Sequence, residues 1–94
     1  MEDKIKIMLV DDHSVVRSGL SAFLSVNPDF ELVGEAENGE QAVSRAAKFQ
    51  PEVILMDLMM PVMDGVAATA EIKKQNPKIQ ISNFNLKFIW LFEI

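Results

Sequence analysis

The sequence has 94 residues, of which 49% are hydrophobic and 24% charged, a balance typical of a globular protein rather than a disordered one. This length accommodates one domain. The net charge is −5 and there is no basic patch, which argues against binding of nucleic acid or an anionic membrane by this chain. The sequence holds no cysteine, which excludes disulfides and thiol chemistry and fits a reducing compartment.

The two ends of the chain do not indicate export or membrane insertion. Residues 1–4 are Met-Glu-Asp-Lys, an acidic start that leads directly into a short apolar segment, unlike a signal peptide. The apolar segment near the C-terminus is too short to span a bilayer and carries Lys87 and Glu93. We therefore expect a cytoplasmic protein without a membrane partner.

Apolar segments with strand and helix periodicity alternate along the chain. The pattern predicts, in chain order, a strand at Ile5–Val10, a helix at Ser14–Val26, a strand at Glu31–Ala36, a helix at Glu40–Phe49, a strand at Val53–Met56, a helix at Val66–Gln75 and the start of a fourth strand at Ile79–Ile81. Each helix ends before a proline, because proline disfavours helical geometry in the residue that precedes it. Strands that alternate with helices over short connections predict an α/β fold, a doubly wound parallel sheet with helices on both faces.

Two of the predicted strands end in carboxylates. Asp11 and Asp12 follow the first strand, and Asp57 follows the third. The carboxyl ends of the strands in an open parallel sheet form the edge at which ligands bind, so these side chains should meet there. Carboxylates at such short distances repel one another unless a cation lies between them. Oxygen ligands favour a hard ion, and we expect Mg²⁺.

Three segments carry a resemblance to a known family: LVDDH at Leu9–His13, GEAENGEQA at Gly34–Ala42 and ILMDLMMPVMDG at Ile54–Gly65. Together, and at this spacing, they resemble the receiver domain of bacterial two-component response regulators over roughly Lys4–Ile81. The segment Val10–Leu20 is most similar to the subgroup whose receiver precedes a LuxR-type helix-turn-helix domain. The resemblance implies the flavodoxin-like strand order of CheY-like receivers.

The resemblance also assigns chemistry to the acidic residues. Asp57 would be the phosphoacceptor, whose carboxylate attacks a phosphoryl group on a histidine kinase. Asp11, Asp12 and Asp57 would hold Mg²⁺, with the backbone carbonyl of Met59 as a further ligand, and the ion would neutralise charge on the phosphoryl group. The competing interpretation is that these carboxylates cap helices or lie in solvated loops, as each would more often do if it stood alone. In this combination we favour the acidic site.

The residues around the acidic cluster receive structural roles. Pro61 and Gly65 are expected to shape the loop after Asp57, and Asp64 is expected to cap the third helix. His13 is interpreted as a capping or packing residue and not as a ligand. Arg17 could pair with a neighbouring acid, but a solvated helix face is the favoured interpretation.

The C-terminal part departs from the family pattern. A complete receiver continues with a helix, a fifth strand and a fifth helix, and it carries a Ser or Thr at the end of the fourth strand and a Lys at the end of the fifth. Here Asn85 stands at the position of the hydroxyl residue, and Lys87 comes too early to be the family's lysine. We therefore divide the chain into a receiver domain at residues 1–81, incomplete after the fourth strand, and an aberrant hydrophobic tail at residues 82–94. The segment Leu86–Ile94 fits a strand or a helix equally well.

A shifted reading frame is one hypothesis for the tail. With permitted codons, Ser82–Leu86 read one nucleotide later gives Val-Ile-Leu-Thr-Ser, which would complete the fourth strand with a Thr in place of Asn85. A naturally divergent or deliberately shortened chain is the alternative, and the nucleotide sequence of the gene decides between them.

An uncovered sheet edge and exposed apolar surface both favour association, so we expect self-association through residues 84–92.

These features predict a phosphoacceptor receiver that a histidine kinase phosphorylates and that, in the full-length relative, regulates transcription. Such a domain catalyses only its own phosphorylation and dephosphorylation and is otherwise not an enzyme. One alternative is an interaction module that no longer signals and associates through its tail. A less favoured one is a Mg²⁺-dependent aspartyl phosphatase, which usually carries a second Asp two residues after the nucleophile, where Met59 stands here.

Overall fold

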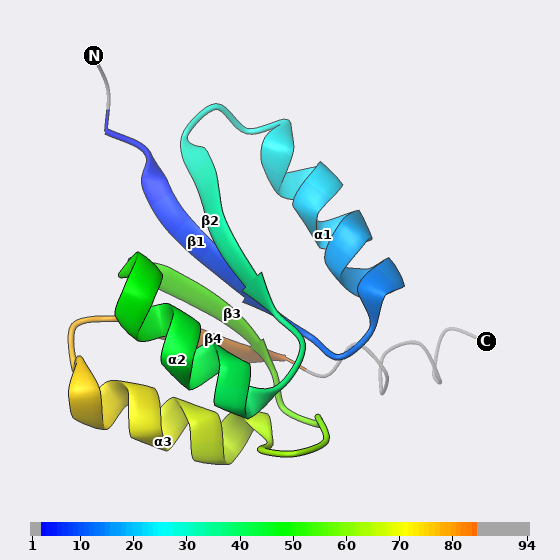
Figure 1. Cartoon of the computed structure of the whole chain (residues 1–94). Helices are drawn as coiled ribbons and strands as arrows, with labels where there is room; N and C mark the ends of the chain where they lie inside the picture. The colour runs from blue at the N-terminus through cyan, green and yellow to red at the C-terminus, as the bar shows by residue number, and fades with distance from the viewer. Residues whose placement is uncertain (1–2, 85–94) are drawn as a thin grey trace.

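The computed structural model describes residues 3–84, and Figure 1 shows strands and helices alternating along that part of the chain. The elements are β1 (Ile5–Val10), α1 (Ser14–Ser25), β2 (Phe30–Ala36), α2 (Gly39–Phe49), β3 (Val53–Asp57), α3 (Gly65–Gln75) and β4 (Gln80–Phe84). All seven elements therefore lie where the sequence pattern predicts them, with boundaries that agree or differ by at most three residues.

The four strands form one parallel sheet in the order β2-β1-β3-β4. Helix α1 lies on one face of the sheet, and α2 and α3 lie side by side on the other (Figure 1). The predicted α/β fold with a doubly wound parallel sheet is thereby confirmed. The strand order places β1 and β3, the two strands that carry the carboxylates, next to each other in the middle of the sheet.

The core is divided between the two faces because strand side chains alternate in direction. The larger cluster lies under α2 and α3 and joins Met8, Val10, Ile54 and Met56 of the sheet to small and aliphatic helix residues such as Ala42, Ala46, Ala68 and Ile72. The smaller cluster lies under α1 and consists of Ile7, Leu9 and Leu24 with partly buried neighbours. The central strands β1 and β3 thus contribute to both clusters, which fixes their carboxyl ends in a rigid frame.

Strand β4 continues beyond Ile81, the last residue of the segment in which the sequence pattern placed its start. The polar residues Ser82 and Asn83 belong to β4 and pair with β3, because the hydrogen bonds of a sheet are made by the backbone. Both side chains are exposed, so β4 accommodates polar residues near its carboxyl end. The domain boundary expected after Ile81 thus falls within a strand, and the described fold runs three residues further, to Phe84.

Predictions about the remaining tail fall on residues that, apart from Phe84, lie outside the described part of the chain. They concern Asn85, Lys87, the conformation of Leu86–Ile94, the reading frame and self-association through residues 84–92. Within residues 3–84, no helix has the length and apolar character that crossing a membrane requires.

Candidate functional site

Two carboxylates lie at the carboxyl ends of the neighbouring strands β1 and β3. Val10 pairs with Met56 in the parallel register, so Asp11 and Asp57 are the next residues on the two neighbouring strands. Both side chains are buried, with Asp11 2% and Asp57 0% exposed. Two buried acids on adjacent strands concentrate negative charge at this edge of the sheet, as the sequence predicted.

The two strand ends share one local hydrogen-bond pattern. The backbone N–H of His13 donates to Asp11 Oδ1 at 2.7 Å, and the N–H of Met59 donates to Asp57 Oδ1 at 3.1 Å. Each carboxylate thus accepts from the residue two positions further on, as in an Asx-turn. This turn holds each carboxylate at its strand end and directs the chain that follows away from the sheet.

Asp12 and His13 extend the acidic cluster beyond the end of β1. His13 Nδ1 lies 3.2 Å from Asp12 Oδ1 and 3.4 Å from Asp11 Oδ1. His13 stands at the N-cap of α1, but its side chain makes no capping hydrogen bond. Of the two roles expected for His13, capping or packing, the side chain does not cap the helix, and its imidazole lies against the two carboxylates instead.

The donor atoms of this cluster fit a small divalent cation. One donor atom from each of Asp11, Asp12 and His13 lies within 4.8 Å of the others, and Asp57 adds a buried carboxylate at the neighbouring strand end. Carboxylate oxygens are the ligands that Mg²⁺ prefers, and a cation here would neutralise their mutual repulsion.

The loop after Asp57 is closed by backbone contacts. The N–H of Gly65 donates to the Leu58 carbonyl at 3.0 Å, and a Cβ at Gly65 would overlap the backbone carbonyl of Asp57. Only glycine therefore lets the start of α3 approach the strand end this closely. Asp64 Oδ1 accepts from the Ala67 N–H at 2.8 Å, which confirms the predicted N-cap of α3.

A tight turn forms the tip of the same loop. The N–H of Met63 donates to the carbonyl of Pro61 at 2.8 Å across Val62, whose φ is 71°. A three-residue hydrogen bond with positive φ at its centre is a γ-turn, a strained conformation for a β-branched residue. Pro61 thus contributes its carbonyl to the turn.

Arg17 contacts the acidic site from α1. Its guanidinium donates to the backbone carbonyl of Asp11 at 2.6 Å through Nη1 and to Glu35 Oε1 at 3.2 Å through Nε. The Arg17 side chain is only 18% exposed, so the favoured interpretation of a solvated helix face is wrong. Helical periodicity did not reveal this contact, because it identifies a face of α1 but not the strand ends beyond it.

The sequence of residues 7–84 matches the family model of the response regulator receiver domain. The response regulator protein VraR of Staphylococcus epidermidis is 51% identical over 77 residues, which are 82% of this chain and 37% of that protein. VraR of Staphylococcus aureus is 49% identical over 77 residues, with the same coverage. The chain therefore spans little more than a third of the length of these curated relatives.

Solved structures agree with the sequence match. A LuxR-family two-component response regulator from an Aurantimonas species is similar with a TM-score of 0.84 and 31% identity, over 88% of this chain and 59% of that one. The response regulator domain of Thermotoga maritima CheB is similar with a TM-score of 0.82 and 34% identity, over 85% and 59% of the two chains. The chain therefore belongs to the family of response regulator receiver domains.

Proposed function

We propose that this receiver domain accepts a phosphoryl group on Asp57 from a histidine kinase. The observation that carries the proposal is the pair of buried acids, Asp11 and Asp57, at the ends of neighbouring parallel strands, with Asp12 beside them. A carboxylate held at a rigid strand end can act as a nucleophile without first being ordered.

The reaction is a transfer between two residues. A carboxylate oxygen of Asp57 attacks phosphorus, the bond between phosphorus and the kinase histidine nitrogen breaks, and that nitrogen keeps the electron pair. The product is an acyl phosphate on Asp57. The chain catalyses only the formation and hydrolysis of this bond, and we infer that it has no further enzymatic activity.

Asp11, Asp12 and Asp57 would hold Mg²⁺, with the backbone carbonyl of Met59 as a further ligand. When bound, the ion neutralises charge on the transferring phosphoryl group. The turns at His13 and Met59 keep the two buried carboxylates oriented toward the strand edge. In a longer protein of this family, phosphorylation of Asp57 would control transcription.

Intact mass tests this proposal directly. The full chain is incubated with acetyl phosphate and MgCl₂, beside an Asp57→Asn variant. An adduct of one phosphoryl group on the wild-type chain, absent from the variant and from samples with EDTA, supports the proposal. A folded wild-type chain without an adduct would favour the alternative of an interaction module that no longer signals.

A further inference from the structure

We propose that Arg17 is a positioning residue that orients the Asp11–Asp12 peptide for cation binding. The inference rests on the proposed function, since an oriented pair of carboxylates has a role only if a cation binds there. It goes beyond that function because Arg17 itself does not lie among the expected ligands.

The contacts of Arg17 restrain the backbone between the two acids. Its Nη1 donates to the Asp11 carbonyl at 2.6 Å, which belongs to the same peptide unit as the N–H of Asp12. On the other side, the N–H of Asp11 donates to the Ala36 carbonyl of β2 at 3.1 Å. The two peptide units that flank Asp11 are therefore each held by a hydrogen bond, which restrains the backbone from which both carboxylates project.

Arg17 is itself held in place by its partner on β2. Its Nε donates to Glu35 Oε1 at 3.2 Å, and the Glu35 carbonyl accepts from Arg45 Nη1 of α2 at 2.5 Å. A continuous path of hydrogen bonds thus runs from α2 through β2 and α1 to the end of β1. A guanidinium suits this role because its planar fork can donate in two directions at once.

The direction in which Arg17→Met changes the Mg²⁺ affinity distinguishes a positioning role of Arg17 from a purely electrostatic one. Arg17 places a positive charge beside the acidic cluster, and this charge repels a cation. If charge alone mattered, Arg17→Met would tighten Mg²⁺ binding. If Arg17 orients Asp11 and Asp12, the same variant weakens Mg²⁺ binding even though a repulsive charge has been removed.

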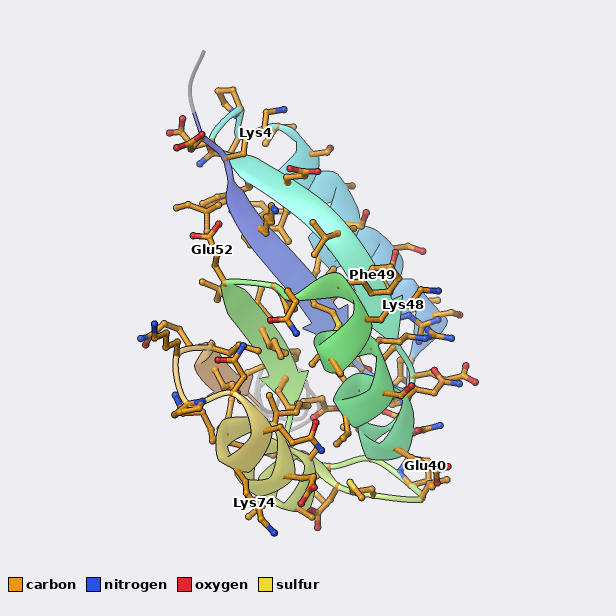
Figure 2. All side chains as sticks on the ribbon, turned by 60° about the vertical axis from the view of Figure 1, so that its left-hand side comes forward. Lys4, Glu40, Lys48, Phe49, Glu52 and Lys74 are labelled. Carbon is orange, nitrogen blue, oxygen red and sulfur yellow. The ribbon has the colours of Figure 1, made fainter. Side chains whose placement is uncertain are left out.

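The matched control is Lys48→Met. Lys48 lies on α2, where its ammonium is 5.3 Å from the centre of the Phe49 ring (Figure 2). This variant removes the same charge and leaves the contacts of Arg17 intact. We expect its Mg²⁺ affinity to equal or slightly exceed that of the wild-type chain.

The experiment is a titration of the full chain with MgCl₂, followed by NMR at the amides of Asp12 and His13. We expect Arg17→Met to weaken Mg²⁺ binding about tenfold, as is usual when a residue that supports a metal ligand is removed. Arg17→Lys keeps the positive charge but not the planar fork of the guanidinium, and it should lose less Mg²⁺ affinity than Arg17→Met. Hydrogen exchange at the Asp12 amide in EDTA should be faster in Arg17→Met and unchanged in Lys48→Met.

The outcomes distinguish this inference from the proposed function. Unchanged or tighter Mg²⁺ binding by Arg17→Met, with unchanged exchange at Asp12, overturns the positioning role, whereas phosphorylation of the wild-type chain would still support the proposed function. A wild-type chain that binds no Mg²⁺ overturns the proposed function and, with it, the role of Arg17 in cation binding. If Arg17→Met does not fold, Arg17→Lys and Glu35→Met apply the same test.

Discussion

The first residue of α2, Gly39, is joined to Met63 in the loop that follows β3: the Gly39 N–H donates to the Met63 carbonyl at 2.8 Å. A Cβ at Gly39 would overlap that carbonyl oxygen. The start of one helix therefore rests directly on the loop that shapes the acidic site, and this contact has no room for a side chain.

Gly39→Ala should destabilise the protein because the new methyl group forces the loop away from α2. We expect a loss of about 1–3 kcal/mol in the free energy of unfolding, typical of overpacking. Gly19→Ala is the control, since Gly19 lies inside α1 with no atom within 4 Å of the added Cβ. Alanine there should stabilise by about 1 kcal/mol. Urea denaturation measures the free energy of unfolding of both variants, and equal effects of the two substitutions would contradict the prediction.

Asp64→Ala should remove the N-cap of α3. Its carboxylate accepts from the Ala67 N–H at 2.8 Å, and loss of such a cap costs about 1 kcal/mol of stability. Asp64→Asn keeps an oxygen acceptor at the same position and should stay within a few tenths of a kcal/mol of the wild-type chain. The measurement is the unfolding midpoint of each variant in urea. An Asn variant as unstable as the Ala variant would show that charge, and not capping, is what Asp64 contributes.

The parts of the fold and site that the sequence predicted are those that local pattern determines. Apolar strands that alternate with helices require a parallel sheet, and the carboxyl ends of its strands must share an edge, so Asp11 and Asp57 could be brought together without coordinates. The cap at Asp64 was predictable because it depends on residues three positions apart.

The parts that could not be predicted depend on contacts between distant segments. Arg17 contacts Glu35 and the Asp11 carbonyl together because β2 lies beside β1, and helical periodicity gives no sign of this. The sequence pattern marked only the start of β4 and not its full extent, for a related reason. Its pairing with β3 is made by the backbone, so the polar side chains of Ser82 and Asn83 did not end it.

Val62→Gly should stabilise the protein, although glycine usually destabilises. Val62 has a φ of 71°, which is strained for a β-branched residue and unstrained for glycine. We expect a net gain of about 1 kcal/mol, since relief of the strain exceeds the added entropy of the unfolded chain.

Val66→Gly is the matched control, because Val66 is similarly exposed but lies in the first turn of α3. That substitution should cost about 0.5–1 kcal/mol. Thermal unfolding of both variants makes the comparison, and a loss of stability in Val62→Gly would contradict the strain argument.

Asp57→Asn should stabilise the protein when no divalent cation is present. Asp11 and Asp57 are buried at the ends of adjacent strands, so their negative charges repel each other in the folded state and much less in the unfolded chain. Replacing one carboxylate by an amide of the same shape should raise the free energy of unfolding by about 1–3 kcal/mol in EDTA.

Mg²⁺ should narrow the difference in stability between Asp57→Asn and the wild-type chain. An ion that binds the folded wild-type chain stabilises it by mass action, whereas the variant has lost one expected ligand and gains less. The measurement is the melting temperature of both proteins in EDTA and in millimolar MgCl₂. Asp57→Gln provides a control of equal charge but different length, which separates the loss of charge from the fit of the side chain. If Asp57→Asn proves less stable than the wild-type chain in EDTA, the carboxylate makes a net favourable contribution to the fold, and repulsion from Asp11 is not the dominant force at this edge of the sheet.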